Sequence, residues 1–298
     1  MVEERLAAWA AEVGDAVSPL LRELRPDAVV TSLFGVEAVA VSAPGVPWGV
    51  INSTFYLGPN PPRPLELDAA PRAQPLLARY ARLLGLPSLV LHATDQVFDL
   101  GFDGLPARHH YTGPLGIWEP PGTVPAYLAE PGDPWVLVSL SSQAQDDLPL
   151  ARAAVEALAD KPLRAVVTVG RGHEAEEVGA VPGHIHVEQL VPHAAVLRRA
   201  DLLLSHAGHG LVMKGLWEAR PMVLVPWGRD QPGVAARAEM LGVAAVVARE
   251  EVSAAMLSAA IDRVIASQPM HAAVAAHSAR LQETDPPAAA ASLLETLL

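Results

Sequence analysis

One stretch of the sequence decides the fold and indicates a ligand site: Ser205-His206-Ala207-Gly208-His209-Gly210-Leu211. It ends an apolar run and opens a segment with helical spacing, as where a strand turns into a helix. Gly208 and Gly210 allow a ligand to approach the backbone closely, and the free N–H groups at a helix start favour an anion such as phosphate. His206 can donate a hydrogen bond to that phosphate. Many such turns bind nothing, so an ordinary tight turn is the alternative.

A second polar turn follows the next apolar run, at Val225–Pro232. Its Asp230 and Gln231 offer acceptors and donors that suit sugar hydroxyls. The alternative for Asp230 is that it caps the helix 232–241, which is a common role. Because the carboxyl ends of neighbouring parallel strands form one crevice, we expect this turn to lie beside the glycine turn.

Two further strand ends carry candidate residues. Ser141 follows the strand 135–140, where its hydroxyl faces the same crevice or belongs to a plain polar turn. Gln189 and Val191 follow the strand 185–187 and lead into Pro192-His193.

The rest of the chain alternates apolar strands with helical segments, the order of a parallel sheet covered by helices. In the first half we expect a helix at 3–25, strands at 28–33, 47–52 and 89–91, helices at 35–43 and 71–84, and a loop at 57–71. In the second half we expect strands at 135–140, 164–169, 185–187, 201–205, 222–225 and 244–247, and helices at 147–160, 192–199, 209–219, 232–241 and 253–267. We therefore predict an α/β fold of two doubly wound, Rossmann-like domains that face each other across a cleft.

Prolines and glycines crowd residues 113–134 and mark the predicted boundary, because this composition sustains neither a helix nor a central strand. The expected parts are residues 1–118, a linker at 119–134, residues 135–268 and C-terminal helices at 269–298.

The composition excludes several classes of protein. Of the 298 residues 51% are hydrophobic and 18% are charged, which predicts a large core, and the net charge of −12 argues against a nucleic-acid binder. The absence of cysteine excludes disulfides, thiolate nucleophiles and cysteine zinc sites. The acidic start lacks the features of a signal peptide, and no run is apolar enough to span a bilayer. We expect a cytoplasmic protein.

The run from Gln189 to Gly242 resembles the donor-binding half of family one (GT-B) glycosyltransferases of the actinobacterial natural-product, macrolide type. The matching pieces, in order, are Val191-Pro192-His193, Ala200-Asp201, His206-x-Gly208-x-Gly210, Pro226, Asp230-Gln231-Pro232 and Ala235-Ala236-Arg237. The resemblance covers 135–268 well and 15–118 more loosely, which would make the first part acceptor-side and the second donor-binding.

The resemblance implies transfer of a sugar from a UDP or TDP sugar to a hydroxyl of a small acceptor, with inversion and without a metal or any cofactor besides the donor. It implies that His206 and the N–H groups around Gly208, His209 and Gly210 hold the diphosphate. It implies that Val191 and Gln189 lie at the base, that Asp230 and Gln231 bind the sugar, and that Ser141 lies near the phosphates or the reacting centre.

The sequence departs from the family within the site. Leu211 stands where the family has Ser or Thr, although its backbone N–H remains. Lys214 stands where a Glu binds ribose; it cannot accept a hydrogen bond, and a phosphate contact is one alternative. Val234 replaces a common Asn.

The family's opening strand and Gly-His turn, which supply the general base, have no match before residue 28, so the first domain is expected to be incomplete and to expose a strand edge. The base is therefore unidentified. His92, His109 and His110 are candidates for it, and surface or strand-edge histidines are the alternative interpretation. An upstream start, an inactive relative, or completion of the sheet by another protein would each account for the difference.

Other functions remain open from the sequence. An inactive GT-B relative or auxiliary binding protein is the main alternative, and a sugar-nucleotide epimerase would need a set of cleft carboxylates and histidines that the sequence does not suggest. The loops 53–70 and 92–110 are expected to line the acceptor pocket, and Phe55, Tyr56 and Leu57 hint at an apolar acceptor. A homodimer is compatible with the sequence, although nothing requires one.

Overall fold

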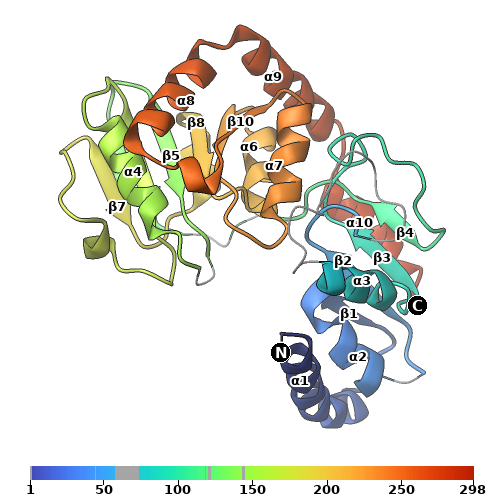
Figure 1. Cartoon of the computed structure of the whole chain (residues 1–298). Helices are drawn as coiled ribbons and strands as arrows, with labels where there is room; N and C mark the ends of the chain where they lie inside the picture. The colour runs from blue at the N-terminus through green and yellow to red at the C-terminus, as the bar shows by residue number, and fades with distance from the viewer. Residues whose placement is uncertain (1, 44, 58–73, 118, 120–121, 143–144) are drawn as a thin grey trace. The chain divides into compact units, whose positions relative to one another are not determined.

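The computed structural model describes residues 2–43, 45–57, 74–117, 119, 122–142 and 145–298. The chain forms two compact units, Met1–Leu115 with Thr284–Leu298, and Gly116–Glu283 (Figure 1). The last segment of the chain therefore belongs to the first unit. None of the described helices is both long enough and apolar enough to cross a membrane.

The second unit is built on a six-stranded parallel sheet. Its strands are β5 (Trp135–Ser139), β6 (Arg164–Thr168), β7 (Ile185–Glu188), β8 (Ala200–Ser205), β9 (Met222–Leu224) and β10 (Ala244–Val246), in the order β10-β9-β8-β5-β6-β7. The chain runs outward from β5 to β7 and then returns to place β8 beside β5. This reversal makes the sheet doubly wound and confirms the predicted fold class for this unit.

Helices cover both faces of this sheet because successive side chains of each strand point to opposite sides. The helices are α4 (Leu148–Leu158), α5 (His193–Leu197), α6 (His209–Trp217), α7 (Gln231–Met240), α8 (Ala254–Ala266) and α9 (Gln268–Gln282). Leu202 and Leu204 of β8 pack in the core shared by α4 and α8, whereas Leu203 lies against Gly215 of α6. All three leucines are fully buried.

The first unit has a four-stranded parallel sheet in the order β1-β2-β3-β4. The strands are β1 (Val29–Ser32), β2 (Trp48–Asn52), β3 (Leu89–His92) and β4 (His109–Tyr111), with helices α1 (Val2–Leu24), α2 (Val36–Ser42), α3 (Gln74–Leu83) and α10 (Pro286–Glu295). Helix α1 packs against α2, and Ala290 and Leu297 pack against Leu89 and Leu91 of β3. β1 forms an edge of the described sheet, where Val30 is 44% exposed.

Most predicted elements end within two residues of the observed ones, and one strand was missed. That strand is β4, which begins at the end of the predicted loop 92–110. The predicted loop 57–71 and the start of the predicted helix 71–84 lie almost wholly outside the described residues. The domain boundaries drawn from the sequence stay predictions, although α9 and α10 belong to different units.

Candidate functional site

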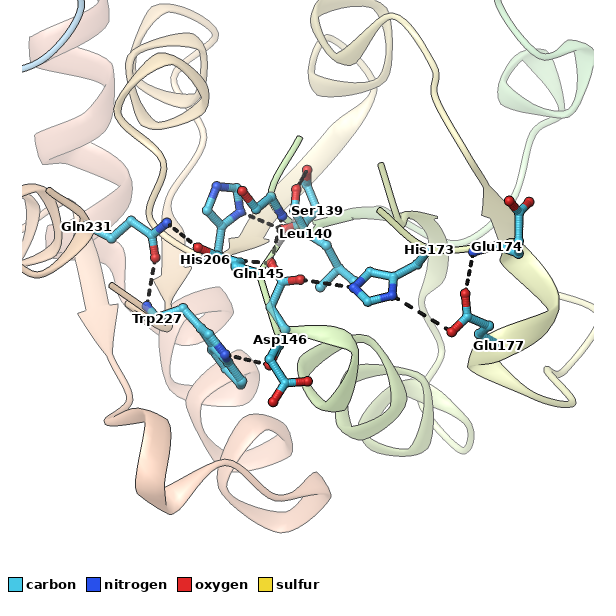
Figure 2. Close-up of polar contacts among 12 residues, drawn as sticks. Ser139, Leu140, Gln145, Asp146, His173, Glu174, Glu177, His206, Trp227 and Gln231 are labelled. Atoms are coloured by element: carbon cyan, nitrogen blue, oxygen red, sulfur yellow. Dashed lines mark hydrogen bonds and ion pairs between the residues drawn. The ribbon is translucent and has the colours of Figure 1, made fainter. Parts of the chain in front are cut away.

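The candidate site lies in the second unit, where the order of the strands reverses. Ser139 at the end of β5 pairs in register with Ser205 at the end of β8. In doubly wound sheets, ligands bind beyond the carboxyl ends of the strands at this switch point. Three turns meet there, after β5, β8 and β9, and Figure 2 shows the polar contacts that hold them together.

The turn after β8 brings His206 against the start of α6. Ala207 is fully buried and has φ of 65°, a strained conformation for a residue with a side chain. Gly208 follows as the N-cap residue directly before α6, and a β-carbon on it would lie 2.5 Å from His206 Nε2. Around Gly210 there is open space, so its backbone can be approached closely.

His206 is held in one tautomer. The residue is 8% exposed, and Nδ1 lies 3.2 Å from the carbonyl oxygen of Ser139 (Figure 2). Since a carbonyl only accepts, Nδ1 carries the proton and Nε2 keeps its lone pair. Burial is the main cause that lowers the pKa of His206, so the ring is neutral at pH 7.

The turn after β5 is organised around Asp147, which is 1% exposed. Its Oδ2 accepts from the backbone N–H of Ser141 at 2.8 Å and from Gln145 Nε2 at 3.1 Å. Its Oδ1 lies 3.5 Å from His173 Nε2. Arg229 Nη1, from the turn after β9, donates to Ser141 Oγ at 3.3 Å and brings a positive charge to the site.

Gln231 fastens the turn after β9. Its Oε1 accepts from the backbone N–H groups of Trp227 at 2.8 Å and Gly228 at 3.0 Å, and its Nε2 donates to Gln145 Oε1 at 3.2 Å (Figure 2). Gln231 is 2% exposed, so its side chain shapes the site from within. Asp230 precedes α7, but its side chain makes no capping hydrogen bond. The capping role that the sequence offered for Asp230 is therefore wrong.

The predicted residues fall into two groups along one edge of the sheet. Seven of them lie in the turns after β5, β8 and β9 or in the first residues of the helices that follow β8 and β9: Ser141, His206, Gly208, His209, Gly210, Asp230 and Gln231. Gln189 and Val191 follow β7, the edge strand two positions from β5. Gln189 is exposed, and its carbonyl accepts from Gly170 at 3.0 Å.

Two residues that depart from the family pattern, Leu211 and Lys214, make defined contacts in the structure. The backbone N–H of Leu211 donates to the carbonyl of Gly208 at 3.1 Å, so the expectation that it remains available to a ligand is wrong. The ammonium of Lys214 bonds to the carboxylate of Glu119, not to a group of the glycine turn. Glu119 Oε2 also accepts from the backbone N–H of Ala194 at 2.9 Å, which ties α5 to α6.

Sequence reasoning missed Glu119, Gln145, Asp147 and Arg229. Glu119 meets a residue 95 positions away, and no local pattern predicts that contact. Arg229 did carry a signal, because it directly precedes the candidate Asp230 and is a cation beside a predicted anion site.

In the first unit, His92 and His109 are buried, so their interpretation as surface histidines is wrong, although β4, which carries His109, is an edge strand of the described sheet. His109 Nε2 donates to the Leu84 carbonyl at 3.2 Å, which leaves its Nδ1 to accept from His92 Nε2 at 3.1 Å. His92 Nδ1 then accepts from Asn52 Nδ2 at 2.9 Å. Burial lowers the pKa of His92 to about 3 and that of His109 to about 4.

The apolar trio Phe55, Tyr56 and Leu57 is also buried, at 0%, 1% and 8% exposure. Tyr56 stacks on Phe102, and its backbone N–H donates to Asp99 Oδ2 at 2.9 Å. These side chains form part of the core, and the apolar character of the acceptor stays a prediction.

Comparisons with known proteins agree with this architecture. Residues 152–297 match the model of the erythromycin biosynthesis protein CIII-like C-terminal domain. Demethyllactenocin mycarosyltransferase of Streptomyces fradiae is 30% identical over 198 residues, 64% of this chain and 41% of that protein. The chain thus spans less than half the length of this relative.

Solved structures show the same fold over the whole chain. The calicheamicin glycosyltransferase CalG4 superposes with a TM-score of 0.75 at 22% identity, over 100% of this chain and 80% of that one. The spinosyn rhamnosyltransferase SpnG, complexed with thymidine diphosphate, superposes with a TM-score of 0.73 at 18% identity, over 97% of this chain and 80% of that one. The predicted GT-B fold and the resemblance to natural-product glycosyltransferases are both confirmed.

Proposed function

We propose that this chain transfers a sugar from a nucleoside diphosphate sugar to a hydroxyl of a small acceptor. Residues 152–297 match the model of the erythromycin biosynthesis protein CIII-like C-terminal domain, which supports this proposal. One observation carries the proposal: His206, Ser141 and the start of α6 converge at the switch point of a doubly wound sheet. A helix start and hydrogen-bond donors at such a point suit a diphosphate.

In this proposal the diphosphate meets His206, the backbone of Gly208, His209 and Gly210, and the hydroxyl of Ser141. Arg229 adds a positive charge that the sequence interpretation did not include. Thymidine diphosphate in the spinosyn rhamnosyltransferase supports a pyrimidine nucleotide, with Val191 and Gln189 beside the base.

Asp230 is the proposed sugar ligand, and Gln231 is assigned a different part. The carboxylate of Asp230 accepts sugar hydroxyls. Gln231 holds the turn that presents Asp230, because its Oε1 is occupied by two backbone amides.

The proposed reaction inverts the anomeric centre. The acceptor oxygen attacks the anomeric carbon from the side opposite the diphosphate, the bond from that carbon to the phosphate oxygen breaks, and the nucleoside diphosphate leaves. The acceptor's hydroxyl proton passes to a base that we leave unassigned. We propose no step through a metal ion, and unchanged turnover after treatment with EDTA would agree with that.

Binding without catalysis is the second candidate, and a specific observation favours it. His92 and His109, two of the histidines considered as the base, form a buried hydrogen-bonded chain that ends on the carbonyl of Leu84. The lone pair of each ring already accepts a hydrogen bond within this chain, so neither histidine offers it to the hydroxyl of a sugar acceptor. The cytoplasmic location and the homodimer stay predictions.

Thermal melting with UDP, TDP, GDP and no nucleotide tests the proposal. A nucleotide at about a hundred times its dissociation constant stabilises the fold by about 2.7 kcal/mol, and we expect UDP or TDP to do so selectively. The His206→Ala variant should lose this stabilisation while it still melts cooperatively. A cooperative melt that no nucleotide shifts would contradict the donor site, and sugar transfer to test acceptors then separates the enzyme from the non-catalytic candidate.

A further inference from the structure

The charge state of His206 conflicts with binding of an anion. Nδ1 keeps its proton and donates it in a hydrogen bond to Ser139 O, so the atom that faces the glycine turn is Nε2 with its lone pair. Phosphate oxygens also only accept hydrogen bonds. A neutral His206 in this tautomer therefore repels the oxygen that it is expected to bind.

Two changes would resolve the conflict: rotation of the ring, or protonation of Nε2. Rotation would break the bond to Ser139 O inside a site where His206 is 8% exposed and Gly208 lies directly against the ring. Protonation keeps the ring in place and turns Nε2 into a donor with a positive charge, which forms the stronger, charge-assisted hydrogen bond.

We propose that the donor's diphosphate binds this site together with one proton, which is taken from solvent onto Nε2 of His206. The inference rests on the proposed function, because it assigns the charge state of the same anion site. The bond to Ser139 O remains, and the imidazolium holds Ser139 O on one side and a phosphate oxygen on the other.

The charges around His206 fit a ring that changes state on binding. Asp147, before α4, and Asp230, before α7, favour the imidazolium, whereas Arg229 disfavours it. His193 on α5 also disfavours it when charged, but burial lowers the pKa of His193 to about 4, so His193 is neutral near pH 7. In the free site burial outweighs the two carboxylates and lowers the pKa of His206. The diphosphate adds negative charge at Nε2 and raises that pKa.

Calorimetry in buffers of different ionisation enthalpy measures the protons taken up. The ligand should be UDP-glucose or TDP-glucose, because both of its phosphates are esterified, whereas the terminal phosphate of a free nucleoside diphosphate titrates near pH 6 by itself. At pH 7.5 we expect the observed enthalpy to rise with buffer ionisation enthalpy, with a slope approaching one proton. The dissociation constant should rise by up to about tenfold per pH unit above neutrality.

Two variants assign the proton to a residue. His206→Gln keeps a donor but cannot titrate, so it should bind with a slope of zero. His193→Gln removes the neighbouring histidine, and its slope should match the wild type. Nitrogen-15 spectra of the wild type give a second readout, with a proton on Nδ1 alone in the free protein and on both ring nitrogens in the complex.

The outcomes separate this inference from the function beneath it. Binding of the sugar nucleotide with a slope of zero, or an unchanged slope in His206→Gln, would overturn proton uptake by His206 and leave the donor site standing. Failure of both sugar nucleotides to bind a cooperatively folded protein would overturn the inference and the proposed function together.

Discussion

Gly208 and His206 constrain each other at the start of α6. Gly208 has φ of −64°, which alanine adopts freely, so the contact of a β-carbon with His206 Nε2 is what requires glycine here. We expect Gly208→Ala to displace the ring and weaken binding of a nucleotide sugar by about tenfold or more, the loss of one charge-assisted hydrogen bond. Calorimetry measures this change.

Gly210→Ala is the matched control for stability. Its β-carbon would meet open space within a helix, so the melting temperature should not fall. If Gly208→Ala bound the nucleotide sugar as tightly as the wild type, His206 would not belong to the site.

Gln231 and Asp230 are neighbours with different expected roles. Gln231→Leu removes the acceptor of two backbone N–H groups, and we expect a loss of about 1–3 kcal/mol in the free energy of unfolding. Chemical denaturation measures this loss.

Asp230→Asn should keep the wild-type stability, because the Asp230 side chain makes no capping bond. It should weaken binding of the sugar nucleotide more than binding of the free nucleotide. An equal free energy of unfolding for Gln231→Leu and Asp230→Asn would show that the hydrogen bonds of Gln231 contribute nothing to stability.

Sequence reasoning reached the residues of this site that follow strands, because a strand end fixes where the next few side chains lie. Ser141, His206 and Asp230 were found in this way. The protonation and hydrogen-bond partners of these residues could not be predicted. The fold brings Ser139 O to His206 and Asp147 to the backbone N–H of Ser141, and no local pattern indicates either contact. In the same way, the sequence does not reveal that Oε1 of Gln231 accepts hydrogen bonds from two backbone N–H groups.

At the scale of elements, Glu119 ties helices α5 and α6 together. Its side chain is 17% exposed and that of Lys214 is 13% exposed. Burial is the largest single effect and raises the pKa of Glu119, but the hydrogen bonds from Lys214 and the Ala194 N–H and the positive charge of Lys214 together outweigh it and lower that pKa. The stability from this pair is therefore complete above the usual pKa of a glutamate and is lost as pH falls below it.

We expect Glu119→Ala to lower the free energy of unfolding by about 1–3 kcal/mol, because it leaves a partly buried ammonium and the Ala194 N–H without their acceptor. Asp262→Ala is the control, since Asp262 is 65% exposed in its pair with Lys161 and should contribute at most about 1 kcal/mol. A double-mutant cycle with Lys214→Met isolates the pair, and a coupling of zero would contradict its role.

Element positions followed from hydrophobic patterns, and the exception has a physical cause. β4 reads His109-His110-Tyr111, which lacks the apolar run of the other strands. It is placed by its parallel pairing with β3 and by the buried bonds of His109 to His92 and Leu84. Such a strand is specified by its neighbours, so the local sequence did not reveal it.

At the scale of the whole molecule, each unit contains two histidines whose pKa is lowered. His92 and His109 lie in the first unit, His193 and His206 in the second. Burial lowers the pKa of all four. Below about pH 6.5 the unfolded chain therefore binds protons at these histidines that the folded chain does not bind. Their contribution to stability is complete above that pH and declines as pH falls toward 4.

Acid should therefore destabilise the protein in a range where carboxylates remain ionised. Between pH 6.5 and 5, each of His92 and His109 should remove about 2 kcal/mol from the free energy of unfolding. Melting curves over this range measure the loss. His109→Gln should make the pH dependence of the first unit shallower, because it removes one of these two histidines. A saturating nucleotide sugar should make the dependence of the second unit shallower too, because proton uptake by His206 on binding removes part of the difference between the folded and unfolded chains. A second unit that keeps its full acid sensitivity with ligand bound would mean that His206 stays neutral in the complex.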